Sequence, residues 1–277
     1  MLYRDADFKR INTAGEMAEF MRLRSLEHGH YSHYSRTERI GSILESGTFW
    51  LSQFNSSNDV TERKFPRNKF MLCFASGTTE NLPLWYLYSG IEGRGARITL
   101  AKGSFQSLVK NATYSLQTFE KDADGKGHLG EAVDVTDMVH VEQRDIFYSS
   151  RDRIKYNGRQ RFSEPKQDDL EPLIEKYRVY NPEFCKELIW FYEKETRWIV
   201  TLPGDKLRLD DTKDYKITAG IPESIYRYIR VRLAPEFESE EERLEVRAKA
   251  GFQKLPDNAV EFSDYKGQIK LGLVQRA

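Results

Sequence analysis

The chain has 277 residues, of which 39% are hydrophobic and 13% aromatic, a composition typical of an ordered globular protein with a sizeable core. It carries 43 Lys and Arg against 43 Asp and Glu, so the net charge gives no general argument for binding to nucleic acid or to a membrane. The first ten residues lack the apolar segment of a signal peptide, and no stretch approaches the roughly 18 apolar residues of a transmembrane helix. Two cysteines, Cys73 and Cys185, lie in separate apolar runs and form no disulfide framework. We therefore expect a cytoplasmic protein without a membrane partner.

The first third of the chain alternates between helical and extended patterns. Helical spacing predicts an amphipathic helix over residues 14–28, which we interpret as an N-terminal extension (residues 1–28) ahead of a single domain (residues 29–277). GHYSHYS, residues 29–35, is extended, and a second helix is predicted to begin at Thr37 and to end at Gly47. Three strands and a short helix follow, with the strands at 48–52, 69–75 and 95–101 and the helix at 82–88.

The rest of the chain continues the mixed order. Strands are predicted at 113–120, 138–148 and 226–233, and helices at 168–180 and 235–250, while 183–190 is compatible with the start of another helix. The strands are short and lack regular βαβ spacing. We therefore predict an α+β domain with mixed or antiparallel sheets in place of a doubly wound one.

One charged stretch stands among bulky apolar residues: FYEKETRWIV, residues 191–200. In a helix, Glu193 and Arg197 would form an i,i+4 ion pair. In a strand, Glu193, Glu195 and Arg197 would all lie on one face, as the residues of a site would. The apolar continuation through Val200 favours the strand.

Several motif matches lack the context that their chemistry needs. Gly125, Gly127 and Gly130 match a dinucleotide fingerprint, but no hydrophobic strand precedes them and no helix follows, so a hairpin loop is expected. His28 and His30 would face away from His33 on an extended chain, which argues against a zinc site. No nucleophile elbow or phosphate-binding P-loop is present.

A basic segment interleaved with aromatic residues lies near the middle of the chain. Its cations alternate with Tyr156 and Phe162, a mixture that suits phosphate contacts and base stacking but is equally compatible with a solvated loop. The candidate substrate-binding cations are Arg151, Arg153, Lys155, Arg159 and Arg161.

Three blocks of the sequence resemble a large bacterial family of unknown function. Residues 33–62 hold a His-Tyr-Ser start, an ILESG helix end and an Asn-Asp pair; residues 70–90 hold Cys-Phe and Trp-x-x-Tyr; the third block is Glu-x-Glu-x-Arg at 193–197. The resemblance covers roughly residues 30–260. That family is in turn distantly similar to the His-type ADP-ribosyltransferases, which include diphtheria-toxin-like enzymes and nucleic-acid-targeting toxins. The resemblance implies a fold of two small sheets with flanking helices, and NAD as a substrate in the cleft between them, without a metal.

The same resemblance assigns roles to the residues that match its motifs. His33 would orient NAD through the adenine-side ribose, and Tyr34 and Ser35 would hold the nicotinamide amide through their backbones. Trp85 and Tyr88 would provide a stacking surface for a ring that becomes cationic.

The late charged block would supply the catalytic carboxylate. Glu195 is the first choice and Glu193 the second, bonding the nicotinamide-side ribose and stabilising an oxocarbenium-like transition state. Arg197 would orient that carboxylate or meet a phosphate. The enzyme hypothesis with these roles requires that His33 and Glu195 face a common cleft, and it fails if they lie on opposite sides of the fold.

Structural interpretations stand beside these roles. His33 is equally compatible with a core histidine bonded to a backbone carbonyl, and Glu195 with a structural ion pair to Arg197. Asp59 and Glu62 are equally compatible with a turn.

The leading function predicted from the sequence is a mono-ADP-ribosyltransferase that modifies a macromolecule. The basic segment favours a nucleic acid, RNA or DNA, over a protein, and the resemblance implies a toxin or phage-defence effector with a cognate antitoxin. Two alternatives remain open: a non-enzymatic nucleotide-sensing or protein-interaction module, and a metal-dependent nuclease built on Asp59, Glu62, Glu193 and Glu195.

Overall fold

The computed structural model of the chain describes residues 11–57, 59, 62–77, 79–90, 93–124, 127–149, 171–204 and 207–269. Twelve strands form one mixed sheet, and β9 and β10 form a separate parallel pair. The strands are β1 His30–Arg36, β2 Thr48–Gln53, β3 Lys69–Ser76, β4 Gly95–Ala101, β5 Tyr114–Lys121, β6 Gly127–Leu129, β7 Val133–Asp134, β8 His140–Asp145, β9 Phe147–Ser149, β10 Cys185–Glu187, β11 Glu195–Thr201, β12 Asp214–Gly220, β13 Arg230–Leu233 and β14 Val260–Phe262.

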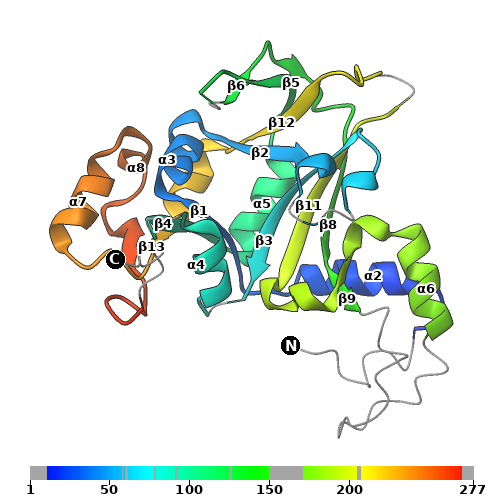
Figure 1. Cartoon of the computed structure of the whole chain (residues 1–277), viewed down its shortest axis with the longest axis horizontal. Coiled ribbons are helices and arrows are strands. Elements are labelled where there is room, and N and C mark those ends of the chain that lie inside the picture. Colours follow the sequence, from blue (N-terminus) through cyan, green and yellow to red (C-terminus); the bar gives the residue numbers. More distant parts are fainter. Residues whose placement is uncertain are drawn as a thin grey trace, which may run out of the picture.

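Helices cover both faces and the edges of this sheet (Figure 1). The α-helices are α2 Ala14–Ser25, α3 Thr37–Ser46, α4 Leu82–Tyr88, α5 Lys102–Asn111, α6 Glu171–Tyr180, α7 Glu240–Ala248 and α8 Ala250–Gln253. Short 3-10 helices connect them: η1 Phe54–Ser56, η2 Glu62–Lys64, η5 Pro182–Phe184, η6 Leu188–Glu193, η7 Glu223–Tyr228 and η8 Asp257–Ala259. No helix in the described ranges is both long and apolar enough to cross a membrane.

Strand β3 is the centre of the sheet, and its two edges are paired differently. One edge pairs with β11 along residues 69–75. The other pairs first with β2, at Phe70 and Met71, and then with β1, at Ala75 and Ser76. Strands β1 and β2 therefore diverge along β3, and residues 72–74 have no ladder partner on that edge.

The two faces of the sheet are chemically distinct at β3. On one face Phe105 of α5 contacts Tyr31, Phe74 and Trp198, which form the largest apolar core. On the other face α4 packs through Trp85 onto Tyr34 of β1. Because side chains alternate along a strand, the neighbours of these core residues belong to the α4 face.

The α+β class predicted from the sequence is confirmed, but the expected division into two small sheets is not what the chain forms. Most predicted elements are present, and the extended residues 29–35 become β1. Residues 183–190 form 3-10 turns around β10 in place of a helix. The sequence prediction missed α5 and β12, whose apolar residues are few and spaced by polar ones.

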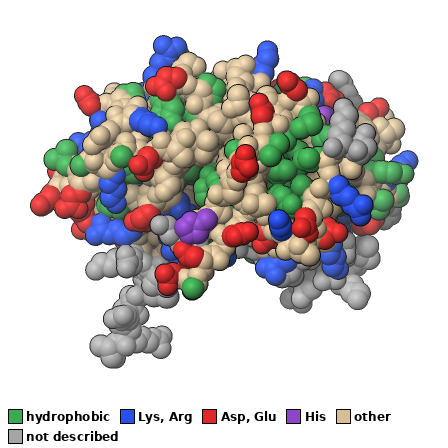
Figure 2. Space-filling model, turned by 90° about the horizontal axis from the view of Figure 1, so that it is seen from above, with side chains coloured by type: hydrophobic (Ala, Val, Ile, Leu, Met, Phe, Trp, Pro, Cys, Tyr) green, Lys and Arg blue, Asp and Glu red, His purple; other side chains and the backbone are tan. Residues whose placement is uncertain are grey.

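Charges of both signs are mixed over the end of the molecule that carries β5, β6 and β12. Figure 2 looks onto this end, where acidic and basic side chains alternate around a group of hydrophobic ones. This face has no field of one sign, in keeping with the equal numbers of acidic and basic residues.

Close packing of α8 against α3 depends on a glycine. A Cβ at Gly251 would lie 2.8 Å from the backbone nitrogen of Glu45 and would clash with the carbonyl oxygen of Gly41. Gly251→Ala should lower the free energy of unfolding by about 2 kcal/mol, since backbone atoms cannot move aside as a side chain can. Urea denaturation followed by circular dichroism measures this.

Gly103 is the matched control, because a Cβ there meets no atom within 4 Å. Gly103→Ala in α5 should raise stability by about 0.5 kcal/mol through reduced backbone entropy of the unfolded chain. Equal effects of the two substitutions would contradict the packing explanation.

Candidate functional site

A cavity of about 310 Å³ opens on the α4 face of the sheet. Its walls come from β1, β3 and β4, from the segment that leads into α4, and from the turn between η6 and β11. The lining residues are Ser32, Tyr34, Ala75, Ser76, Gly77, Thr79, Glu80, Asn81, Leu82, Pro83, Arg97, Tyr192, Lys194 and Tyr265.

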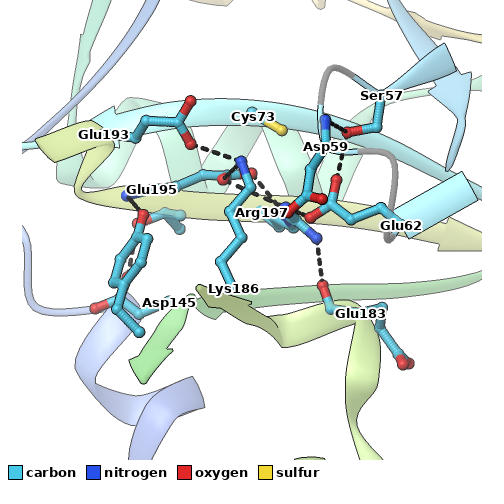
Figure 3. A network of polar contacts seen from close by, with 12 residues as sticks. Ser57, Asp59, Glu62, Cys73, Asp145, Glu183, Lys186, Glu193, Glu195 and Arg197 are labelled. Carbon is cyan, nitrogen blue, oxygen red and sulfur yellow. Dashed lines mark hydrogen bonds and ion pairs between the residues drawn. The ribbon is translucent and has the colours of Figure 1, made fainter. Parts of the chain in front are cut away.

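Beside this cavity, the fully buried guanidinium of Arg197 joins three segments of the chain (Figure 3). Its Nε donates to Glu195 Oε1 at 2.6 Å, and its Nη1 donates to the carbonyl oxygen of Glu183 at 2.6 Å. Its Nη2 forms an ion pair with Glu62, whose other oxygen accepts a hydrogen bond from Ser57. Nη2 also donates to Glu195 Oε2 at 3.4 Å, so each of the three guanidinium nitrogens has an acceptor, as a buried arginine requires.

Lys186 extends this network toward the start of β11. Its Nζ lies 2.6 Å from Glu193 Oε2 and 3.0 Å from Glu195 Oε2, and all three side chains are at least nine-tenths buried. The backbone of Lys194 adopts φ 45°, which turns the chain from η6 into β11. That turn brings the carboxylates of Glu193 and Glu195 to the same ammonium group, that of Lys186.

Burial and charge give the two glutamates opposite pKa shifts. Burial alone would raise the pKa of Glu195, but Arg197 and Lys186 outweigh it and hold the pKa of Glu195 far below its usual range. Burial, and then the negative charge of Glu195, raise the pKa of Glu193 to about 7. Glu195 is therefore a permanent anion, and Glu193 can gain or lose a proton near neutral pH.

The network and the cavity share a wall. Ala75 lines the cavity and is the cross-strand partner of Glu195. Tyr192 and Lys194, on either side of Glu193 in the sequence, also line it. Asn81 Nδ2 donates to the carbonyl oxygen of Tyr192 and so ties the start of α4 to this turn. The buried Glu193 is not itself a lining residue, but both of its neighbours in the chain are.

The expectation that His33 and Glu195 face a common cleft is wrong. His33 contacts Phe49 and Phe74 on the α5 face, whereas Glu195 lies on the α4 face. The Nδ1 of His33 donates to the carbonyl oxygen of Cys73 at 3.0 Å, where β1 and β2 diverge from β3. Burial lowers the pKa of His33. The contacts are those of a core histidine satisfied by a backbone carbonyl, the structural interpretation given above.

The aromatic residues assigned to ligand stacking are placed differently from expectation. Trp85 is fully buried and donates its Nε1 to Glu80 at 2.8 Å, so it offers no free ring face, and that prediction is wrong. Tyr88 is partly buried, and its pKa is raised by burial and by the charge of Glu193. Tyr34 does line the cavity. The backbone role predicted for Ser35 stays a prediction.

The geometry of the late charged block is partly as predicted. Strand β11 begins only at Glu195, so Glu195 and Arg197 share a face, while Glu193 belongs to the preceding 3-10 turn. The basic segment with Arg151, Arg153, Lys155, Arg159 and Arg161 lies outside the described residues.

The carboxylates proposed for a nuclease do not form a metal site in this arrangement. Glu62, Glu193 and Glu195 are all bound to Arg197 or Lys186. In the described part of the chain, no three or more His, Cys, Asp or Glu residues are grouped so that they could hold a metal ion. A cation at this place would be repelled by the two basic groups already there.

Two important residues were not identified from the sequence. Lys186 lies in β10, and Arg97 lies in β4 within the cavity wall. Each is a single charged residue in an otherwise ordinary strand, so the neighbouring sequence does not mark it as part of a site. The partners of Lys186, Glu193 and Glu195, lie on the elements that follow β10 in the chain. The partner of Arg97 is the hydroxyl of Tyr34 on another strand.

No protein-family model matches the sequence, and no curated protein does. The resemblance to a bacterial family is therefore not accompanied by a family-model match. Among solved structures, the chain is similar to DarT from Thermus sp. 2.9 in complex with carba-NAD+, at 9% identity and a TM-score of 0.34, covering 86% of this chain and 97% of that one.

Two further DarT structures give similar values. The complex with NAD+ has 10% identity and a TM-score of 0.32, covering 85% of this chain and 96% of that one. The complex with ADP-ribosylated ssDNA has 12% identity and a TM-score of 0.34, covering 85% and 94%. A distant likeness of this extent assigns neither a fold family nor an activity to this chain.

Loss of the Arg197 guanidinium should strongly destabilise the fold. Arg197→Met leaves the Glu62 and Glu195 charges buried beside each other, and we expect it to cost about 3–5 kcal/mol of stability. Chemical denaturation at pH 7 measures the loss. The exposed Arg94, paired with Glu242 on the surface, is the control, and Arg94→Met should cost less than about 1 kcal/mol.

The raised pKa of Glu193 makes stability depend on pH. The unfolded chain releases this proton near pH 4.5, whereas the folded chain keeps it to about pH 7. The unfolded state then binds fewer protons, so stability falls as pH rises between these values. Glu193→Gln should remove this fall, and its free energy of unfolding at pH 8 should exceed that of the wild type by about 1–3 kcal/mol.

Denaturation midpoints from pH 5 to 8.5 test this dependence. Glu187→Gln is the control, because Glu187 lies on the same segment in a loose ion pair with Arg178 and should leave the pH profile unchanged. Parallel pH profiles for wild type and Glu193→Gln would contradict the near-neutral pKa.

Proposed function

We propose that this chain is a mono-ADP-ribosyltransferase that binds NAD in the cavity on the α4 face and transfers ADP-ribose to a macromolecule. The observation that carries the proposal is Glu193, a carboxyl with a pKa of about 7 whose two neighbours in the chain, Tyr192 and Lys194, line the cavity. A group poised near the working pH is what general acid–base chemistry uses.

The charge of the network suits the bond that would break. When the C–N bond between nicotinamide and ribose breaks, its electron pair leaves with nicotinamide, and positive charge develops on the ribose. The carboxylates of Glu62, Glu193 and Glu195 outnumber the cations of Arg197 and Lys186 once Glu193 is ionised. This net negative charge would stabilise the cationic transition state.

Glu193 would also receive the proton of the acceptor. The acceptor's oxygen or nitrogen forms the new bond to the ribose carbon with its lone pair, and its proton passes to the Glu193 carboxylate. Tyr34, Tyr192 and Tyr265 line the cavity and would offer ring faces to nicotinamide. Every step uses groups that this chain holds.

The proposal moves the main role from Glu195 to Glu193. Both oxygens of Glu195 are engaged by Arg197 and Lys186, and the residue is 3% exposed. Glu195 acts as a positioning residue that raises the pKa of Glu193. His33 has no direct part, since it lies on the other face of the sheet.

The acceptor is proposed to be a nucleic acid. Support comes from the basic segment 151–161 in the sequence, and ssDNA is an acceptor worth testing because one neighbouring structure contains it in ADP-ribosylated form. A role as a toxin or phage-defence effector, with a cognate antitoxin as partner, rests on the sequence resemblance alone.

A second candidate is a nucleotide-binding module without chemistry. The observation that favours it is the full engagement of Glu195 and the sequestration of His33, the two residues that the resemblance would make catalytic. Calorimetry with NAD distinguishes the two. Saturable binding without release of nicotinamide supports the module.

The enzyme proposal predicts a specific loss in one variant. With labelled NAD and single-stranded DNA, RNA or cell lysate, the wild type should transfer label, and Glu193→Gln should lower the rate roughly 100-fold or more. The wild-type rate should fall as pH drops below about 7, since protonation removes the base.

Glu187→Gln is again the matched control and should keep the wild-type rate. No nicotinamide release and no transfer by folded wild type would overturn the proposal. A Glu193→Gln variant with the full rate would remove Glu193 from the mechanism.

A further inference from the structure

The same cavity holds a buried guanidinium that forms no ion pair with any carboxylate of the described residues. Arg97 is 4% exposed and lines the cavity. Its Nη1 donates to the hydroxyl of Tyr34 at 3.0 Å, while its Nε is buried without a hydrogen-bond partner. Among the described residues no Asp or Glu forms an ion pair with it, in contrast to Arg197 and Arg232.

Glu80, the one carboxylate among the described residues of the cavity wall, already has several hydrogen-bond donors. Glu80 accepts from Trp85 Nε1 at 2.8 Å, from Ser263 Oγ at 2.6 Å and from the backbone nitrogen of Asp264 at 2.7 Å. It also forms an ion pair with Arg232 at 3.0 Å. Arg232 also pairs with Glu261 at 3.2 Å and with Asp264 at 2.7 Å. The oxygens of Glu80 are therefore all engaged by other groups, and none of these carboxylates forms an ion pair with Arg97.

The hydroxyl of Tyr34 supplies a donor next to this cation. Its oxygen accepts from Arg97 Nη1 and from the backbone nitrogen of Asn81, both at 3.0 Å. With the oxygen used as an acceptor, the hydroxyl hydrogen is left to donate elsewhere. Burial raises the pKa of Tyr34, which keeps this hydrogen in place at neutral pH.

An unpaired buried cation costs several kcal/mol unless a counter-charge reaches it. The ring of Tyr34, 5.6 Å from the guanidinium carbon, offsets part of that cost. The free N–H groups of a guanidinium match the oxygens of a phosphate, and Lys194 adds a second cation to the same wall.

We propose that Arg97 and Tyr34 form an anion site that binds the phosphate groups of a nucleotide. That this nucleotide is NAD rests on the proposed function; the anion site itself rests on Arg97 and stands without it. The cavity binds the phosphates on the β4 side, and the ribose then lies toward Tyr192 and Lys194.

Calorimetric titration with inorganic pyrophosphate and with ADP-ribose tests this site. Wild type should bind both probes, with ADP-ribose the tighter, and Arg97→Gln should weaken both at least tenfold. Tyr34→Phe should weaken both about threefold. Arg94→Gln, which alters an exposed arginine outside the cavity, should bind as the wild type does.

Thermal unfolding separates a binding defect from a folding defect. Unliganded Arg97→Gln should melt no lower than the wild type, because removal of an unpaired buried charge relieves its desolvation cost, and pyrophosphate should no longer raise its melting temperature. Pyrophosphate that binds Arg97→Gln as tightly as wild type overturns the anion site. Binding of pyrophosphate without ADP-ribose overturns the nucleotide assignment.

These outcomes are independent of catalysis. Pyrophosphate and ADP-ribose binding that needs Arg97, in a protein that does not consume NAD, leaves the anion site standing and removes the transferase. If neither probe binds and Arg97→Gln turns over NAD as fast as the wild type, the transferase stands and the anion site is overturned.

Discussion

The region around the cavity depends on one buried cation. Arg197 is inaccessible to solvent, and its guanidinium bonds η2 through Glu62, η5 through Glu183 and its own strand through Glu195. These segments are distant in the sequence, so a single planar group with several donors fixes their relative positions. The buried positive charge is tolerated only because the surrounding carboxylates and the carbonyl oxygen accept its hydrogen bonds.

That arrangement also creates an electrostatic imbalance next to the cavity. Glu195 is neutralised by Arg197 and Lys186 together, and Glu193 is left with a share of Lys186 alone. The resulting pKa near 7 opposes folding at high pH and at the same time gives the protein a group able to exchange protons. Arg97 has a comparable character, because its buried Nε has no hydrogen-bond partner among the described residues. Both are features that binding or chemistry would explain and that packing does not.

The cavity and the core share one sheet with sharply different faces. His33 and Tyr34 are neighbours in β1, yet one closes the gap where β1 and β2 diverge, and the other lines the cavity. The period-two alternation of a strand makes that separation unavoidable. A motif that places two functional residues side by side in a strand must therefore use one of them structurally or through its backbone.

The sequence by itself determined the α+β order, the buried strands and the grouping of Glu195 with Arg197, because apolar runs and alternation are local properties of the chain. It also set Tyr31 and His33 on the face opposite Ser32 and Tyr34. Only the tertiary structure decided which face meets the cavity, that Lys186 would neutralise Glu195, and that Arg97 would have no carboxylate partner among the described residues. Those outcomes depend on burial and on charges summed over distant segments, which no local pattern encodes.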